Sequence, residues 1–179
     1  MLIIGKKIPE LMQGYPTVSD KYDVVPATLD SASTAVKAGT PVVFTGVAGV
    51  YNAPASGATI GQYAGFVLAT NVKVPTTYPA SYTDQEYLAG QAFNLMIKGS
   101  IAVRVGSAAT LANIVNGAPV YVTLATGAIV TSSEASSDVT VQLPGAYFTG
   151  VTTLAGGTLG STTVGDSAVY LAEVAYNVV

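Results

Sequence analysis

The sequence predicts an all-β protein, a barrel or sandwich of short strands with an extended N-terminal arm and at most one or two short helices. Two observations support this prediction. From Ala27 onward, short runs rich in Val, Ile, Thr and Tyr alternate with Gly, Pro, Asn and Ser, which is the pattern of strands separated by turns. These runs recur about every 8–12 residues, a spacing typical of sandwiches and barrels. The β-rich body is therefore expected to occupy residues 27–179.

Residues 1–26 differ from the body because their apolar side chains follow no long period. Proline and glycine interrupt every possible helix in this stretch, at Pro9, Gly14, Pro16 and Pro26. We interpret the stretch as an extended arm. Its larger apolar side chains require burial, so we expect the arm to contact another subunit. The alternative is a loop that packs on its own domain.

The body is expected to be built mainly from strands. In chain order, the candidate strands span residues 41–47, 63–69, 93–98, 101–105, 119–124, 128–131, 139–143, 146–151 and 168–178. Helix is expected at two places only. Thr83 and Glu86 have the spacing of a capping box, which predicts a short helix over residues 83–89. Residues 107–115 could form another short helical turn.

A weak internal repeat divides the body. Residues 38–44 (AGTPVVF) resemble residues 116–122 (NGAPVYV), and residues 64–69 (AGFVLA) resemble residues 144–149 (PGAYFT). The two matches have nearly the same offset, which predicts two related β units at about 27–80 and 100–179. Coincidence in a sequence rich in Gly, Val, Ala and Thr is the alternative.

The composition excludes several kinds of chemistry. The chain has 179 residues and contains neither His nor Cys, so a Ser/His/Asp triad, a thiol nucleophile, a Cys zinc site and a disulfide are impossible. Seven basic residues and a net charge of −3 argue against nucleic-acid binding. We expect no catalytic residue, no cofactor and no metal, although a hydrolase working through carboxylates alone (Asp20, Asp23, Asp84 or Glu86) remains a formal alternative.

The sequence also argues against a membrane protein. Polar residues, glycine or proline interrupt every apolar run before the length of about 18 residues that marks a membrane-spanning helix. Lys6 and Lys7 follow a short apolar run and do not precede a longer one, unlike the charges of a secretory signal peptide. We therefore expect the protein to be made in the cytoplasm and to be kept there or assembled into a larger structure there.

The surface is expected to bind protein neighbours. Only 9% of the residues are charged, against about 25% in an ordinary soluble domain, so little charge repulsion separates copies. Tyrosine combines apolar area with a polar tip and suits interfaces, and two tyrosines lie in the Pro-rich connection over residues 74–82. Addition of the arm as a strand is one plausible mode of contact. The expected contact residues are Leu2, Ile3, Ile4, Ile8, Leu11, Met12, Tyr15, Tyr78 and Tyr82.

The second half of the chain resembles the structural cement, or head decoration, proteins of tailed phages. The resemblance rests on IAVRV at 101–105, GAPVY at 117–121, ATG at 125–127, LPGAYF at 143–148 and LAEV at 171–174, in this order. It implies a small β-rich protein on the outer surface of the virion, bound over junctions between major capsid protein subunits and without catalytic activity. It also implies a homotrimer, with a dimer as the alternative. The arm has no counterpart in the resemblance.

These observations predict a structural virion protein that cements a bacteriophage capsid. Its partners would be the major capsid protein and further copies of itself, with no nucleic acid and no membrane. The alternative is a receptor- or carbohydrate-binding β module of a viral fibre or adhesin, whose loop tyrosines would stack on sugars. The absence of Trp argues against that alternative.

Overall fold

Strands make up nearly all the regular structure of the computed structural model, which describes residues 13–17, 22–69, 86–105, 111–131, 139–155 and 169–177. The all-β prediction is therefore confirmed. The strands are β1 (Asp23–Leu29), β2 (Val36–Lys37), β3 (Pro41–Phe44), β4 (Val50–Asn52), β5 (Tyr63–Val67), β6 (Glu86–Tyr87), β7 (Ala92–Arg104), β8 (Pro119–Thr123), β9 (Ile129–Val130), β10 (Thr140–Ala155) and β11 (Val169–Asn177). Two short 3-10 helices, η1 (Ile60–Gln62) and η2 (Leu111–Asn113), complete the described elements.

The observed elements differ from the sequence prediction in several places. The separate strands predicted before and after Gly99 form one strand, β7, and those on either side of Pro144 and Gly145 form β10. Strand β1 begins at Asp23, inside the range predicted for the arm, and β1, β2 and β4 were not among the predicted strands. The helix predicted over residues 83–89 is wrong for its described part, because Glu86 and Tyr87 form β6 and pair with β2.

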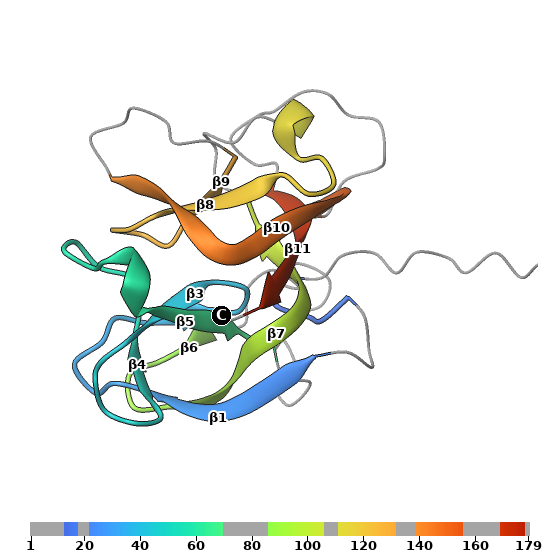
Figure 1. The fold of residues 1–179 in the computed structure, drawn as a ribbon. Coiled ribbons are helices and arrows are strands. Elements are labelled where there is room, and N and C mark those ends of the chain that lie inside the picture. Colours follow the sequence, from blue (N-terminus) through green and yellow to red (C-terminus); the bar gives the residue numbers. More distant parts are fainter. Residues whose placement is uncertain are drawn as a thin grey trace, which may run out of the picture.

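Five strands pair with one another to form a closed ring. Strand β1 pairs in parallel with β4 and antiparallel with the first half of β7. Strand β3 pairs antiparallel with both β4 and β5, and β5 pairs with β7, which completes the ring. Figure 1 shows this group, which we call the first unit, in the lower part of the view.

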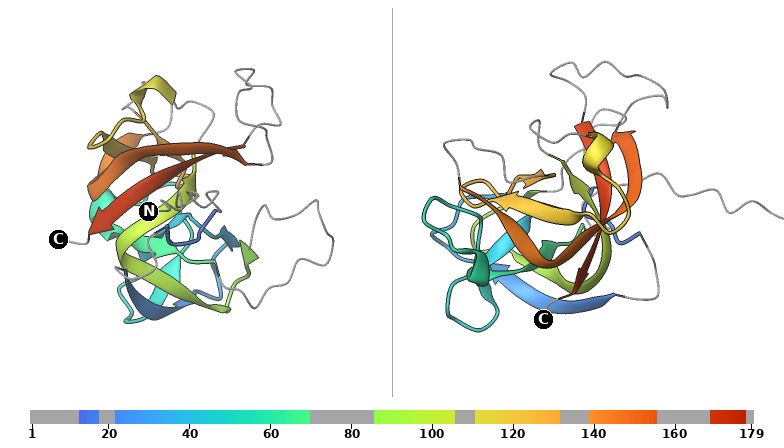
Figure 2. Two further views of the ribbon diagram at one scale, coloured as in Figure 1. Left: turned by 90° about the vertical axis from the view of Figure 1, so that its right-hand side faces the viewer. Right: turned by 45° about the horizontal axis from the view of Figure 1, so that its top comes forward.

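The second half of β7 begins another ring, the second unit. Strand β11 pairs antiparallel with β7 and β10, and β8 pairs antiparallel with β10 and β9. A parallel bridge between Val105 and Ile129 joins β9 back to the end of β7. Strand β7 therefore belongs to both units, and the left view of Figure 2 shows the second unit stacked above the first.

The pairing of the first unit recurs in the second. In the β3–β4 hairpin, Val43 lies opposite Asn52 and Phe44 lies opposite Tyr51. In the β8–β9 hairpin, Tyr121 lies opposite Val130 and Val122 lies opposite Ile129, so each residue is 78 positions after its counterpart. The turn glycines Gly49 and Gly127, also 78 positions apart, both have positive φ angles, of 76° and 69°. The pairing therefore gives five pairs of corresponding strands. Strand β1 corresponds to the second half of β7, β3 to β8, β4 to β9, β5 to β10, and the first half of β7 to β11.

Strand β5 lies between two apolar cores, which explains its nearly continuous burial. Val67 packs in the core of the first unit, whereas Phe66 points to the opposite face and packs with side chains of the second unit. The Phe66 ring contacts the Tyr176 ring edge-on, with 5.2 Å between centroids. The Tyr63 hydroxyl donates a hydrogen bond to the Leu124 carbonyl at 3.0 Å, so it also connects the two units.

Burial of the two tyrosines predicts a loss of stability at high pH. Desolvation raises the pKa of Tyr63 and of Tyr176 from 10 to about 12. The folded chain therefore keeps both hydroxyls protonated while the unfolded chain loses the protons above pH 10, which favours unfolding. We expect the urea midpoint to be constant below about pH 9 and to fall between pH 10 and 12.

Phenylalanine variants test this expectation. The double variant Tyr63→Phe/Tyr176→Phe should show a smaller fall of the midpoint over the same pH range, because neither ring can then ionise in the unfolded chain. The matched control is Tyr147→Phe, since Tyr147 is 48% exposed. An equal fall in the wild type and the double variant would contradict the assignment.

Candidate interaction surface

The first described part of the predicted arm, residues 13–17, lies against its own chain. We call it the docked segment. It runs antiparallel to β7, where the Gly14 N–H donates to the Ala102 carbonyl at 2.8 Å and the Thr17 N–H donates to the Ser100 carbonyl at 3.0 Å. For these residues the structure therefore shows packing on the chain's own body.

A carboxylate on β11 also holds the docked segment. Glu173 is half-buried, and its Oε1 accepts a hydrogen bond from the Thr17 hydroxyl. Its Oε2 accepts a hydrogen bond from the Thr149 hydroxyl at 2.6 Å. Glu173 thus joins the docked segment to β10 and β11 through neutral hydroxyl donors, an arrangement that stabilises packing.

Gly14 is the residue on which this docking depends most. Its φ angle is 76°, and a Cβ atom added there would collide with the Cβ of Ala38 and lie 2.9 Å from the main-chain nitrogen of Gly39. We therefore expect Gly14→Ala to weaken the docking of residues 13–17 by about 1–3 kcal/mol.

Hydrogen exchange tests the Gly14 prediction. The amide protons of Thr17 and Ala102, which form hydrogen bonds between the docked segment and β7, should exchange at least about fivefold faster in Gly14→Ala. The control is Gly61→Ala, because a Cβ there would meet nothing within 4 Å. Unchanged rates at both amides in Gly14→Ala would show that docking does not require glycine at this position.

An exposed apolar turn joins β3 to β4. Phe44 is 39% exposed and Val47 is 61% exposed. The Phe44 ring begins a row of aromatic contacts that continues through Tyr51 and Phe93 to Tyr87, with ring centroids 5.8, 6.4 and 5.8 Å apart. The Tyr87 hydroxyl donates to the Leu68 carbonyl at 2.8 Å, so the row is fixed at its buried end. These contacts fix Phe44, at the base of the turn, on a rigid support.

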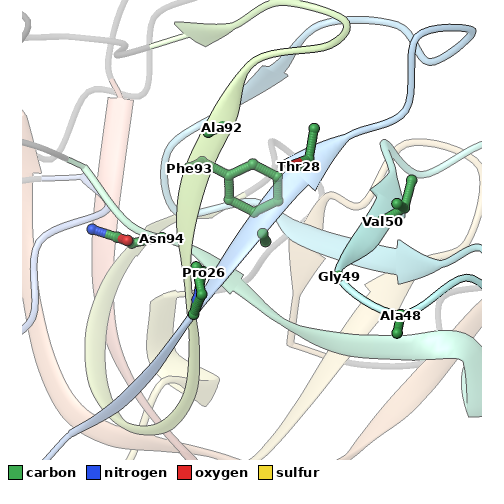
Figure 3. Close-up of a pocket in the computed structure, with 9 residues that line it drawn as sticks. Pro26, Thr28, Ala48, Gly49, Val50, Ala92, Phe93 and Asn94 are labelled. Carbon is green, nitrogen blue, oxygen red and sulfur yellow. The ribbon is translucent and has the colours of Figure 1, made fainter.

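A groove of about 470 Å³ opens beside β1 in the first unit. Its lining residues come from β1, from the turn before and the start of β4, and from the start of β7: Pro26, Ala27, Thr28, Ala48, Gly49, Val50, Ala92, Phe93 and Asn94. Figure 3 shows the Phe93 ring extending from β7 toward β1. None of these side chains is ionisable, so this β1 groove suits an uncharged occupant and lacks the groups for acid–base catalysis.

The model of the family described as "Structural cement protein (E217 gp24/Pam3 gp6)" matches residues 4–177. The chain belongs to the phage structural cement protein family. The structure is also similar to a chain from "The capsid of Myoviridae Phage XM1", with a TM-score of 0.59 and 16% sequence identity over 98% of this chain and 95% of that chain. That likeness shows a shared fold. No curated protein matches the sequence.

Family membership gives this cement protein a structural role in a phage capsid, as the sequence resemblance implied. Most of the expected contact residues lie outside the described residues: Leu2, Ile3, Ile4, Ile8, Leu11, Met12, Tyr78 and Tyr82. Tyr15 is half-buried within the docked segment.

Sequence reasoning missed the β1 groove and the turn that carries Val47. The groove combines three segments far apart in the chain, so no local motif reveals it. The turn carries a local signal, because Val47 lies between the two turn glycines Gly46 and Gly49, where polar residues are usual.

The described residues of the cement protein show no group of three or more acidic side chains that could hold a metal ion. Of the carboxylates considered for a hydrolase, Asp23 lies on β1 and Glu86 on β6, in different sheets. Asp20 and Asp84 lie outside the described residues. In the part of the chain that the structure describes, no helix has the length and apolar character needed to cross a membrane.

Proposed function

We propose that this cement protein stabilises a bacteriophage head by binding across neighbouring major capsid protein subunits on the outer surface of the shell. The family match over residues 4–177 is the observation that carries the proposal. On this account the chain is not an enzyme, binds no nucleic acid or membrane, and is assembled onto the head in the host cytoplasm.

The low charge of the chain fits a contact made of many neutral patches. With 9% charged residues, electrostatic attraction alone would give weak binding, so apolar and tyrosine contacts must supply most of the affinity. Each contact can be modest, because copies that bind at several points on a repeating shell are retained by effective concentration. A homotrimer or dimer would add further points of attachment.

The proposed contacts, with the shell or with a neighbouring copy, are the apolar residues of the arm, with Tyr15, and the two tyrosines of the Pro-rich connection, Tyr78 and Tyr82. Truncating an interfacial tyrosine commonly costs more than about 1 kcal/mol. The double variant Tyr78→Ser/Tyr82→Ser should therefore bind shells at least about tenfold more weakly than the wild type.

Co-sedimentation tests the proposal. Purified protein is mixed with empty shells of the major capsid protein from the same phage, and the bound fraction and the melting temperature of the shells are measured. We expect saturable binding and a higher melting temperature. The matched control is Tyr147→Ser, an exposed tyrosine of β10 outside the proposed contacts. Absence of binding to the shells, or glycan binding without shell binding, would contradict the proposed function.

A further inference from the structure

We propose that the outer edge of β1, with the β1 groove beside it, binds an extended N-terminal segment from a second copy of this chain. The segment would come from residues 1–12 and would add to β1 as an antiparallel strand. The inference extends the self-association proposed above and gives it a defined contact.

The edge of β1 is only partly paired. Thr28 and Asp30 donate their N–H groups to the carbonyls of Gly49 and Tyr51, at 2.8 and 2.9 Å. Because the main-chain groups of a strand alternate between its two edges, Val24 and Pro26 face this same edge. Among the described residues, no hydrogen bond is recorded to Val24 or Pro26 on this side. Within the described part of the chain, these two carbonyls therefore face no partner strand.

Pro26 is consistent with an edge position. Proline has no N–H to donate, and strands accept it where that side of the main chain lacks a partner strand. The residues of β1 that bond to β7, such as Ala27 opposite Phe93, keep their donors. An added strand would therefore bond mainly by donating to the carbonyls of Val24 and Pro26.

The second unit shows what occupies the corresponding edge there. In the second unit, Val105, which directly follows β7, pairs in parallel with Ile129, just as Leu29 of β1 pairs in parallel with Tyr51 in the first unit. Each residue in the second half of β7 is therefore 76 positions after the residue of β1 to which it corresponds. Ser100 and Ala102 therefore correspond to Val24 and Pro26. Ser100 and Ala102 are the two residues whose carbonyls accept hydrogen bonds from the docked segment.

The hollows beside the two edges correspond as well. The second unit has a hollow lined in part by Arg104, Thr126, Gly127 and Ala128, the counterparts of Thr28, Ala48, Gly49 and Val50 in the β1 groove. Gln13, the first residue of the docked segment, also lines this hollow. The hollow has a volume of about 150 Å³, against about 470 Å³ for the β1 groove. An extended segment of this chain thus occupies the second position, whereas the first is open in the described structure.

Residues 1–12 of the same chain would have to reverse direction to reach the β1 groove, whereas a segment from a second copy would not, so we take a second copy as the source. The docked segment runs along β7 from Ala102 to Ser100, and β1 continues on the same edge from Lys98 toward Ala92. The N-terminal end of the docked segment is therefore the end farther from β1. Pro26 lies opposite Asn94, eight residues along β7 from Ala102, or about 26 Å at the usual rise of a strand.

Residues 1–12 supply apolar side chains that fit the β1 groove, while Lys6, Lys7 and Glu10 would have to lie outside it. The apolar side chains include those of Leu2, Ile3, Ile4 and Ile8, which suit a lining without ionisable side chains. Ile8-Pro9 also repeats the pattern of Tyr15-Pro16, in which the proline of the docked segment lies opposite Ile101.

Disulfide trapping tests the proposal on the full chain, which contains no native cysteine. Ala48→Cys and Ile8→Cys are prepared as two separate variants, mixed without shells and oxidised. We expect a mixed disulfide dimer, identified by mass spectrometry, in at least about tenfold greater yield than from the control mixture of Ala55→Cys with Ile8→Cys. Ala55 is exposed in a turn that does not line the groove.

A second variant keeps the test independent of the trapping chemistry. Ala48→Lys places a charge beside the outer edge of β1, and a lysine at a strand edge opposes the addition of another strand. This variant should therefore weaken self-association at least about tenfold in sedimentation equilibrium. Ala55→Lys should not. Equal trapping from the two mixtures, or unchanged self-association in Ala48→Lys, would overturn the inference. Shell binding by a chain that shows no trapping would also overturn it, while leaving the proposed function intact.

Discussion

Replacing Phe66 by Ala is expected to lower the free energy of unfolding by about 3–5 kcal/mol. Phe66 is fully buried and belongs to the apolar core that joins the two units. Its truncation would remove the edge contact with Tyr176 and leave a cavity between β5 and β11, where the surrounding strands are fixed by pairing on both sides and cannot collapse to fill it.

Urea denaturation measures this effect. The control is Phe44→Ala, because Phe44 lies on the neighbouring strand β3 and is 39% exposed, so its truncation should cost much less. A loss of similar size in both variants would show that the core between the units contributes no more than an ordinary surface contact.

Gly65→Ala is expected to cost at least about 2 kcal/mol through crowding of the main chain. A Cβ atom at this position would collide with the Met96 carbonyl oxygen and would lie 3.1 Å from two carbon atoms of the Leu95 side chain. Strands β5 and β7 would have to separate at the point where the first unit closes, and neither can move freely because each is paired on its other edge.

Gly61→Ala is the matched control for this position. Gly61 lies in η1, only four residues earlier in the chain, and an added Cβ would meet nothing within 4 Å. Its urea midpoint should stay close to that of the wild type. A destabilisation of Gly65→Ala no larger than that of Gly61→Ala would mean that β5 and β7 do not approach as closely as described.

The pattern of short apolar runs predicted where most strands lie, because side-chain composition and turn residues are local features. The sequence could not predict that two pairs of runs are continuous strands. Gly99 reads as a turn, yet β7 passes through it, because its first half pairs with β1 and its second half with β11. Long-range pairing thus overrides the local signal of glycine.

Tertiary contacts also explain the error at residues 83–89. The capping-box spacing of Thr83 and Glu86 favours a helix, but Tyr87 is 3% exposed, packs against Phe93 and pairs with Val36. Burial of a large aromatic ring outweighs a capping preference of about 1 kcal/mol. Strand β1 was not predicted at all, because Pro26 reads as a strand breaker although among the described residues it faces an edge without a partner strand.

The internal repeat is more informative than its weak sequence similarity suggests. Two short matches predicted units at about 27–80 and 100–179, and the equal register of the β3–β4 and β8–β9 hairpins supports a common origin for the two units, which we propose. The interaction surface could not be predicted in the same way. The β1 groove exists only because β1, the turn before β4 and β7 meet in the fold.

Cryo-electron microscopy of the source phage particle tests the central claim most directly. The claim predicts copies of this chain on the outer face of an icosahedral shell, with each copy lying over a junction between major capsid protein subunits. A shell that carries no copies on its outer face, or copies that each touch a single capsid subunit, would contradict it.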